Sequence, residues 1–474
     1  MSDLTGLGAI LARQRDAFVA ARPEPLTVRR DRLERCAALL KEHGEALAAA
    51  MSADFGHRSR EQSLIGDVMP ALSAVRHAIA HLKAWARPER RPVAFPLGLL
   101  GARAEVRYEP KGVVGIVAPW NFPVGLTLTP LAQVLAAGNR AIIKPSEFTE
   151  RTSDLLADIF ARRFAPEEVA VVNGGPEVGQ AFCALPFDHL LFTGATSVGR
   201  QVLRAAADNL VPVTLELGGK SPVIVGRSAD LVRAAERIAM GKMMNAGQIC
   251  LAPDYLLVPE DLEAVAVGAI ATAVAAMYPR MLDNDDYTSV INRRHRDRLA
   301  DLVADATGLG ARATVVNPAG EDFAGSNGNK LPLTILTNVH DGMKVMQDEI
   351  FGPVLPVMTY RSVDQAIAMV NARDRPLALY YFGQDRAERE RVLSRTLSGG
   401  VTVNDVLFHV SMEDLPFGGI GPSGMGAYHA IEGFRTFSHA RAVYRQSPFD
   451  VARLAGLRPP YRGATARLLA ARLR

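Results

Sequence analysis

The sequence predicts an α/β fold in which parallel sheets are covered by helices, in two successive regions. After a helical N-terminal region, short apolar runs alternate with helical stretches, and a second series of the same kind begins near Gly218. Alternating strands and helices favour a parallel sheet with helices on both faces. The length of 474 residues is sufficient for two or three domains at roughly 150 residues each.

The first region begins with helices. Apolar residues recur every three or four positions at 29–50 and 61–85, and a link rich in proline and arginine at 87–96 closes this part. Strands are then expected at 113–118, 141–143, 169–172, 190–193 and 213–217, with helices at 127–137, 151–163 and 198–207 between them.

The second region repeats the pattern. A glycine-rich loop at 416–426 follows it and leads to a last strand at 442–445. Within the region, strands are expected at 223–225, 314–316 and 354–359, and helices at 231–245, 261–277, 364–370 and 388–397.

Composition limits the classes of partner. The formal net charge is only +4, without the concentrated basic stripe of a nucleic-acid-binding protein, so no nucleic acid partner is expected. Three widely separated cysteines are an odd number, which argues against a disulfide framework and favours a reducing cytoplasm. The tail at 458–474 is basic. It is predicted to form a short helix packed on its own protein, with a membrane-surface helix as the alternative.

Cys250 lies in the stretch Asn-Ala-Gly-Gln-Ile-Cys-Leu-Ala-Pro-Asp-Tyr. A structural cysteine normally lies on an apolar face, where it behaves as a small hydrophobic residue. Cys250 instead follows Gly247 and Gln248, which indicate an irregular backbone that another segment can approach closely. Cys250 is therefore a candidate nucleophile. Cys36 and Cys183 lie in apolar helical contexts and are interpreted as structural.

Two polar residues at the ends of apolar strands are candidates for the same chemistry. Asn121 follows the strand at 113–118, and ligands bind beyond the carboxyl ends of parallel strands. Its amide can donate to an oxyanion, or the residue can simply form a turn. Two leucines flank Glu216 and exclude water from its carboxyl group. This loss of hydration raises the pKa of Glu216 toward that of a general base. The alternative is an ion pair between Glu216 and Lys220.

Two charged residues that follow the strand at 141–143 are candidates for binding a nucleotide. Lys144 and Glu147 follow the strand at 141–143, where they can bind ribose hydroxyls or a phosphate. The alternative is that both are solvated loop charges. Further along the chain, Glu349 and Phe351 can hold a ribose and pack on a ring, or can simply begin a strand.

Residues 193–199 read Thr-Gly-Ala-Thr-Ser-Val-Gly and connect a strand to a helix. Gly194 permits a tight turn, and the N-terminus of the helix beyond it offers free N–H groups to a phosphate. The pattern is G-x-T-x-x-G rather than the dinucleotide fingerprint G-x-G-x-x-G. A helix start capped by Thr196 or Ser197 is the alternative.

In their order along the chain, these motifs resemble the NAD(P)-dependent aldehyde dehydrogenase superfamily. The resemblance covers nearly the whole chain, and the wording around Cys250, with Phe437-Ser-His, is similar to the class-3-type branch. Within that branch, Asn404-Asp405 with His409 is most similar to bacterial coniferyl aldehyde dehydrogenases. The motifs that carry the resemblance are 119–123, 144–147, 193–199, 216–220, 247–250, 349–351 and 416–426.

The resemblance implies an activity and a set of roles. Cys250 would attack an aromatic or extended apolar aldehyde, Asn121 and the Cys250 N–H would hold the oxyanion, and Glu216 would activate water to release the acid. No metal is implied. The alternatives are a medium- or long-chain fatty aldehyde, or a catalytically silent NAD-binding structural protein. The cofactor positions implied by the resemblance are Trp120, Lys144, Glu147, Thr193, Gly194, Thr196, Gly199, Glu349 and Phe351.

A carboxylate at Glu147 favours NAD, because it would repel the 2′-phosphate of NADP, although class-3-type relatives often accept both. Ala195 is a departure from the family, in which many relatives carry a hydroxyl residue facing the pyrophosphate. The family fold implies a dinucleotide-binding domain, a catalytic domain and a small β oligomerisation extension, and favours a homodimer. The expected ranges are 1–101 and 118–217, with a C-terminal contribution after about 417, for the first domain; 218–416 for the second; and 102–117 with 441–445 for the extension.

Overall fold

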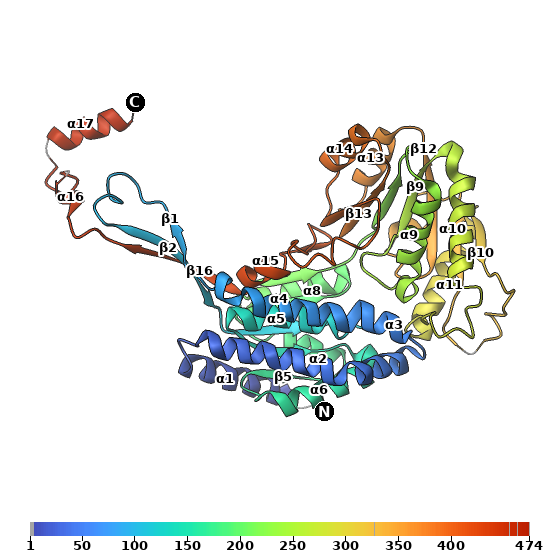
Figure 1. Ribbon diagram of the computed structural model, residues 1–474, viewed down its shortest axis with the longest axis horizontal. Coiled ribbons are helices and arrows are strands. Elements are labelled where there is room, and N and C mark those ends of the chain that lie inside the picture. The colour runs from blue at the N-terminus through green and yellow to red at the C-terminus, as the bar shows by residue number, and fades with distance from the viewer. Residues whose placement is uncertain (1–3, 327, 455, 462, 474) are drawn as a thin grey trace.

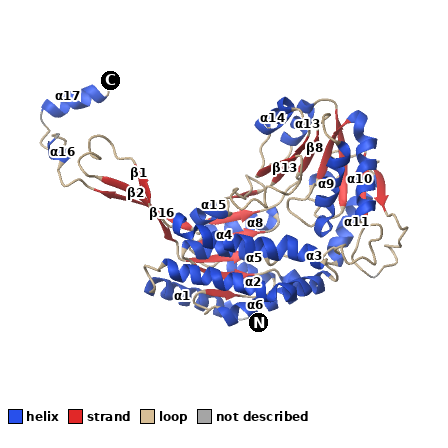
Figure 2. Cartoon of the chain, in the orientation of Figure 1, coloured by secondary structure: helices blue, strands red, loops and turns tan. Residues whose placement is uncertain are grey.

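The computed structural model describes residues 4–326, 328–454, 456–461 and 463–473. They form two α/β bodies, each built on one sheet, and a β arm that projects away from both (Figure 1). Figure 2 shows the strands of each body enclosed by helices. The predicted α/β class with two largely parallel sheets and a small β extension is confirmed.

The first sheet has six strands in the order β15-β7-β6-β3-β4-β5. All neighbouring strands are parallel except β15, which runs antiparallel to β7. Helices α2, α4, α5 and α6 cover one face, and α1, α7 and α8 cover the other. The strands are β3 (Val113–Val117), β4 (Arg140–Lys144), β5 (Val169–Val171), β6 (His189–Thr193), β7 (Val213–Glu216) and β15 (Gly424–Met425). The helices are α1 (Leu4–Ala20), α2 (Leu26–Phe55), α3 (Arg60–Ser63), η1 (Leu64–Val68), α4 (Met69–Trp85), α5 (Gly125–Ala137), η2 (Glu147–Thr149), α6 (Glu150–Arg163), α7 (Pro176–Cys183), α8 (Thr196–Ala207) and α15 (Ala430–Thr436).

The strand order creates a crevice. From β3 the chain moves outward through β4 and β5, then returns to the other side of β3 for β6 and β7. Such a reversal leaves an opening beyond the carboxyl ends of the two central strands, where ligands bind in open α/β sheets. The register aligns Val117 with both Lys144 and Phe192, and Thr193 with Glu216, so these strands end at one edge.

The second sheet has seven strands in the order β10-β11-β12-β9-β8-β13-β14, and only the edge strand β10 is antiparallel to its neighbour. Helices α9 and α10 cover one face, and α11, α13 and α14 cover the other. The strands are β8 (Pro222–Val225), β9 (Tyr255–Pro259), β10 (Arg312–Val316), β11 (Leu333–Thr337), β12 (Val354–Tyr360), β13 (Ala378–Phe382) and β14 (Gly400–Val403). The helices are α9 (Leu231–Met243), η3 (Met244–Gly247), η4 (Glu260–Leu262), α10 (Glu263–Met277), α11 (Arg293–Gly308), α12 (Lys344–Gln347), α13 (Val363–Asn371) and α14 (Arg386–Arg395).

The connection between the sheets decides how they face each other. Strand β7 ends at Glu216 and β8 begins at Pro222, so five residues lead from the carboxyl edge of one sheet to the amino edge of the next. Loops before β8, β9 and β12 lie at this amino edge, because the three strands are parallel neighbours. The apolar core under α2, α4 and α5 continues into residues of the second body, including Ile249 and Val406.

The arm is a three-stranded antiparallel sheet of β1 (Glu89–Arg91), β2 (Arg103–Pro110) and β16 (Ser438–Arg445). Residues 113–117, expected in this extension, instead form β3 at the centre of the first sheet, so that expectation was wrong. The run Val-Val-Gly-Ile-Val is almost entirely buried, as in a strand covered on both faces, whereas β2 is half-exposed along its length. The last strand is also longer than the expected 442–445.

The basic tail is not packed on either body, contrary to expectation. Helices α16 (Val451–Leu454) and α17 (Gly463–Arg472) follow the arm, and α17 lies at its far end (Figure 1). Leu469 is 49% exposed and Leu473 is 85% exposed. The ribbon of β2 and β16 carries the chain away before the tail begins; residues 462 and 474 of the tail lie outside the described residues. Across the described residues, every helix is too short or too polar to span a bilayer.

Candidate active site

The residues singled out from the sequence lie where the two sheets face each other. Lys144, Thr193 and Glu216 end or nearly end β4, β6 and β7, and the turn with Trp120 and Asn121 follows β3. The loops before β9 and β12 bring Cys250 and Glu349 to the same space from the second sheet. In the first sheet the candidate residues follow the carboxyl ends of the strands, as expected. In the second sheet they precede the amino ends of the strands.

The Cys250 loop has an irregular backbone, as predicted. The expected helix at 231–245 ends two residues early, because Asn245, Ala246 and Gly247 adopt left-handed φ values of 49°, 52° and 75°. A Cβ on Gly247 would lie 2.5 Å from the carbonyl oxygen of Gly352, so only glycine permits this approach. Three successive residues in this sparsely populated region mark a loop that its surroundings hold in place.

Gln248 and Asn245 hold the loop from inside. The Gln248 side chain donates from Nε2 to the carbonyl oxygens of Asn245 and Ser289 at 2.8 and 3.0 Å, and its Oε1 accepts from Ile291 N at 2.9 Å. The Gln248 carbonyl oxygen accepts from Asn121 Nδ2 at 3.2 Å. The predicted oxyanion amide is thus tied directly to the segment that carries the predicted nucleophile. The alternative in which Asn121 bonds its own backbone is not what the structure shows.

Two carboxyl groups act on the Cys250 thiol. Burial raises the pKa of the thiol, and the charges of Glu349 and Glu216 raise it further. Burial also raises the pKa of Glu216 well above its usual value, and burial with the charge of Asp254 raises the pKa of Glu349 to about 8. A thiol and two carboxyls therefore share one desolvated space, where protonated forms are favoured until a positive charge or a proton acceptor is present.

Glu216, the predicted base, is buried. Neither of its oxygens has a hydrogen-bond partner among the described residues, although the side chain is 1% exposed. The alternative pairing with Lys220 was wrong: Lys220 Nζ pairs with Asp254 and donates to Val345 O at 2.7 Å. The carboxylate of Glu349 lies against Gly218, where any Cβ would collide with it.

The nucleotide motifs meet on the other side of this space. Lys144 is buried and donates to Glu147 Oε2 at 3.0 Å, so Lys144 is not a solvated loop charge, whereas Glu147 is partly exposed. Thr193 Oγ1 is buried and has no partner among the described residues. Gly194 N donates to Glu216 O at 3.0 Å, which fixes the turn beside Glu216.

Helix α8 begins without a side-chain cap. Its N-cap residue is Ala195, and Thr196 Oγ1 donates instead to Pro422 O at 3.2 Å, in the glycine-rich loop. The alternative of a capped helix start is therefore wrong. The N–H of Val198 donates to Ala195 O at 3.0 Å, and those of Thr196 and Ser197 stay available for an anion. Gly199, on the same helix, lies so close to Leu217 that a Cβ would overlap its side chain.

Trp120 joins the two bodies through aromatic contacts. Its ring centroid lies 5.3 Å from that of Phe351 and 5.3 Å from that of His295, both in the second body. On its own side it lies 6.0 Å from Phe55 and 6.5 Å from Phe148. Trp120 and Phe351, predicted to bind the same cofactor, are therefore brought together.

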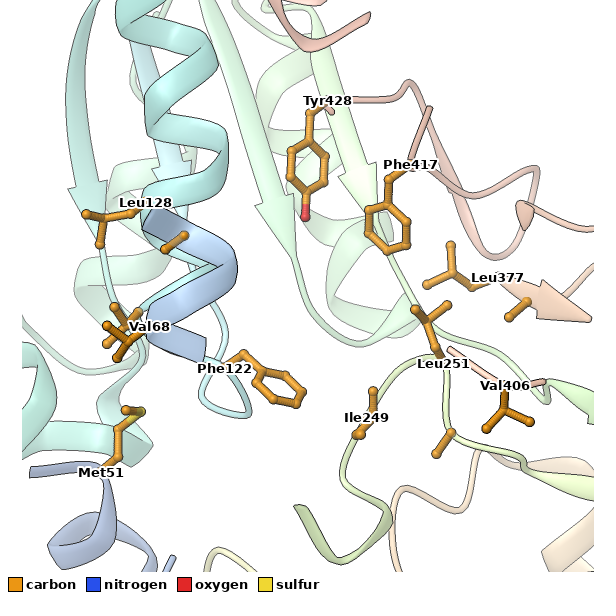
Figure 3. Packing of buried hydrophobic residues seen from close by; sticks show 14 of the residues in the cluster. Met51, Val68, Phe122, Leu128, Ile249, Leu251, Leu377, Val406, Phe417 and Tyr428 are labelled. Carbon is orange, nitrogen blue, oxygen red and sulfur yellow. The ribbon is translucent and has the colours of Figure 1, made fainter. Parts of the chain in front are cut away.

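Apolar side chains line the approach to Cys250. Figure 3 shows Phe122 directed toward Ile249 and Leu251, the two neighbours of Cys250, with Phe417 and Tyr428 above them. The Phe417 and Tyr428 rings are in edge contact, with centroids 5.7 Å apart. These rings come from two distant parts of the chain and belong to the apolar cluster against which Cys250 packs.

Several residues of the site were not singled out from the sequence. Gln248 and Asn245 stand in the Cys250 motif itself, so their spacing is a signal that could have been read. Arg58 and Tyr428 carry no local signal, because each reaches the site only through tertiary folding. Arg58 is completely buried and donates to Asn121 O at 2.9 Å.

Comparisons with known proteins agree with this geometry. The model of the aldehyde dehydrogenase family matches residues 6–443. The chain is 56% identical to a probable coniferyl aldehyde dehydrogenase of Caulobacter vibrioides, over 98% of this chain and 96% of the relative. It is 53% identical to a coniferyl aldehyde dehydrogenase of a Pseudomonas species, over 96% and 94%. A solved structure of Staphylococcus aureus AldH in a substrate-bound state superimposes with a TM-score of 0.90 at 34% identity, covering 98% of both chains. The chain therefore belongs to the aldehyde dehydrogenase family, and it is an enzyme that oxidises an aldehyde to a carboxylic acid with a nicotinamide dinucleotide.

Proposed function

We propose that the enzyme oxidises coniferyl-type aromatic aldehydes, with Cys250 as nucleophile, Asn121 as oxyanion donor and Glu216 as base. The observation that carries the catalytic part is the contact between Asn121 Nδ2 and Gln248 O, which holds the amide beside the Cys250 loop. The substrate class is supported by the two relatives at 56% and 53% identity, which are a probable and a named coniferyl aldehyde dehydrogenase. The aromatic surroundings of Phe122, Phe417 and Tyr428 fit a planar substrate (Figure 3).

The chemistry follows from the groups at the site. Cys250 Sγ bonds to the carbonyl carbon of the aldehyde, and the carbonyl oxygen becomes an oxyanion. Asn121 Nδ2 exchanges the Gln248 carbonyl for this oxyanion, which carries more negative charge and accepts a stronger hydrogen bond. The Cys250 N–H is the second donor. A preformed donor of this kind commonly contributes about 3 kcal/mol to transition-state stability.

The proton must leave the thiol before attack, since the thiolate is the reactive form. Burial raises the pKa of the thiol, so the unpartnered carboxylate of Glu216 is the acceptor that the site offers. After oxidation, Glu216 first releases the thiol proton to solvent and then takes a proton from water. The water oxygen bonds to the acyl carbon, the bond from that carbon to Cys250 Sγ breaks, and Sγ receives the proton that Glu216 took from water. The products are the carboxylic acid and the free thiol.

The residues present fit a nicotinamide dinucleotide. The uncapped start of α8 suits the pyrophosphate, and the Lys144–Glu147 pair suits ribose hydroxyls. The buried hydroxyl of Thr193 has no hydrogen-bond partner within the described ranges. Glu349 and Phe351 suit the second ribose and the ring face. When bound, the dinucleotide supplies the hydride acceptor for the oxidation. Since Ala195 has no hydroxyl, the backbone of α8 alone would hold the phosphates.

NAD is the proposed cofactor, and coniferyl aldehyde with NAD is the combination expected to turn over best. Glu147 is partly exposed and positioned by Lys144, so a 2′-phosphate beside it would meet a like charge. The test measures absorbance at 340 nm with coniferyl aldehyde and decanal, each with NAD and NADP. We expect kcat/KM to be at least about tenfold higher for coniferyl aldehyde, and for NAD over NADP, a difference of ~1.4 kcal/mol.

Faster turnover of decanal would show that the enzyme prefers fatty aldehydes to aromatic ones. The proposed roles of the catalytic residues would be unaffected. The catalytically silent alternative predicts no NADH with either aldehyde. A preference for NADP would contradict the role given to Glu147.

We further propose a homodimer formed through the arm and a cytoplasmic location. Strand β16 is the edge of the arm sheet, and no strand of the described residues pairs with its outer side. An uncovered edge of eight residues, with Tyr444 half-exposed on it, is a template for pairing with a second copy. Light scattering should give twice the mass of one chain, and a monomer would contradict the proposal. The three free cysteines suit a reducing compartment.

A further inference from the structure

Arg58 is a completely buried charged residue that the roles above do not include. It lies between the end of α2 at Phe55 and the start of α3 at Arg60, far from Asn121 in sequence. Its guanidinium contacts the ring of Phe55 at 5.0 Å and that of Phe122 at 5.2 Å. Burying a guanidinium costs free energy, and an apolar side chain would fill the same volume more cheaply. The directional hydrogen bond and the ion pair that it makes therefore need an explanation.

The hydrogen bond ends on the turn that carries Asn121, and the ion pair ends on Asp67. Arg58 Nη1 donates to the carbonyl oxygen of Asn121 at 2.9 Å, and Nη2 lies 3.4 Å from Asp67 Oδ2. Asp67, on the π-turn η1, accepts through Oδ1 from the N–H of Gly125. The Arg58–Asp67 pair is thus hydrogen-bonded to both ends of the turn 121–125, through Arg58 at Asn121 and through Asp67 at Gly125. The ring of Phe122, in the middle of that turn, lies over the guanidinium.

The same short segment is also bonded to the second body. His57 O accepts from Ser289 N at 2.9 Å, and Ser59 N donates to Thr288 Oγ1 at 3.2 Å. Ser289 O in turn accepts from Gln248 Nε2. A further bond joins Gln62 Oε1 to Asn245 N at 2.8 Å. Both the loop of the nucleophile and its neighbour at 288–289 are therefore held by residues 57–62.

Asn121 and the Cys250 loop thus share one anchor. Asn121 O accepts from Arg58 and also from Asn245 Nδ2 at 3.1 Å, so its backbone is fixed from both bodies. The side chain of Asn121 must meet an oxyanion formed on Cys250, and an error of about 1 Å in such a placement costs roughly 10²-fold in rate.

We propose that Arg58, held by Asp67, is a positioning residue that sets the amide of Asn121 relative to Cys250, a role that rests on the proposed function. Arg58 touches neither substrate nor thiol in this role. It acts through the Asn121 carbonyl, and its loss lowers the rate of the first chemical turnover and leaves substrate and cofactor binding nearly unchanged.

The test is a double-mutant cycle on the pre-steady-state burst of NADH. The first change is Arg58→Met with Asp67→Asn, which removes both buried charges together and leaves no carboxylate unpaired. We expect the burst rate constant to fall about 10- to 100-fold, with KM for NAD and for the aldehyde altered by less than about threefold. Asn121→Ala alone should lower it by ~10²–10³-fold.

The decisive measurement combines the two changes. If Arg58 acts through the Asn121 amide, adding the Arg58/Asp67 change to Asn121→Ala lowers the burst rate by less than about threefold more. Effects that multiply, or an Arg58/Asp67 variant with the wild-type burst, would overturn the proposal. If that variant does not fold, Arg58→Lys replaces it, because lysine keeps the charge and loses the planar fork. Its burst should fall in the same direction, and only in the presence of Asn121.

Arg32→Met is the matched control. Arg32 is also buried and paired with carboxylates, those of Glu24 and Glu168, but it contacts no residue of the site. Its loss should lower the melting temperature and leave the burst rate unchanged; an equal fall in the burst would mean that Arg58 acts only through stability. Failure of the proposed function itself has a different signature, which is a wild-type enzyme without a burst or one whose burst survives Cys250→Ala.

Discussion

Cys250→Ala is expected to abolish NADH formation, with kcat falling by on the order of 10⁵-fold or more, because no thiohemiacetal can form without the thiol. The fold should be retained, since Cys250 lies on a loop held by Gln248 and Asn245 rather than by its own side chain. Quenching of protein fluorescence on NAD addition should persist. The measurement is initial-rate absorbance at 340 nm at saturating aldehyde and NAD.

The chain offers two matched controls for this change. Cys36 and Cys183 are free thiols buried in the cores of the first body, and burial raises the pKa of Cys36 to about 12 and of Cys183 to about 11. Alanine at either position should leave kcat within about threefold, with at most a modest loss of stability from the small cavity. Activity above a hundredth of the wild-type value in Cys250→Ala would refute the nucleophile.

Glu216→Gln should separate the two halves of the reaction. Its amide cannot take a proton from water, so the acyl group stays on Cys250 and steady-state turnover falls by ~10²–10⁴-fold. Because Glu216 also receives the thiol proton in the scheme above, the first turnover should slow, but one NADH per active site should still appear. Rapid-mixing absorbance followed by mass determination of the acylated chain measures both. A variant that turns over at the wild-type rate would remove Glu216 from the mechanism.

The pH profile of Glu216 has a definite sign. Burial raises its pKa well above the usual value, so the carboxylate form that accepts protons is less populated than in an exposed glutamate and becomes more populated as the pH increases. Steady-state turnover of the wild type should therefore rise with pH. The Glu216→Gln variant should lack this rise. A profile that is flat for the wild type would show that another group sets the rate.

The sequence alone determined the fold class and most of the strand ends. An apolar run that stops at a charged residue, as Arg140–Lys144 and Val213–Glu216 do, marks where a buried strand meets solvent or a site, and this depends only on local burial. The irregular backbone before Cys250 was also readable, because Gly247 permits a conformation that most residues avoid.

Only the tertiary structure decided which of these ends face each other. Hydrophobic periodicity indicates whether a side chain is buried, but it does not indicate which edge of one sheet faces which edge of the other sheet. The position of Cys250 and Glu349 at the amino edge of the second sheet could therefore not be predicted. The same holds for the arm, where a half-exposed strand and a buried one, β2 and β3, are neighbours in sequence.

The partners of long-range hydrogen bonds could not be predicted from the sequence for the same reason. Lys220 pairs with Asp254 rather than with the nearby Glu216. Folding brings Asp254 within reach of Lys220, and it leaves Glu216 without a hydrogen-bond partner in the part of the chain that the structure describes. Arg58 resembles any surface arginine in sequence, and it becomes part of the site only because folding places it under Asn121. Local residue types determined the chemistry of this enzyme, and the packing of two sheets against each other determined its geometry.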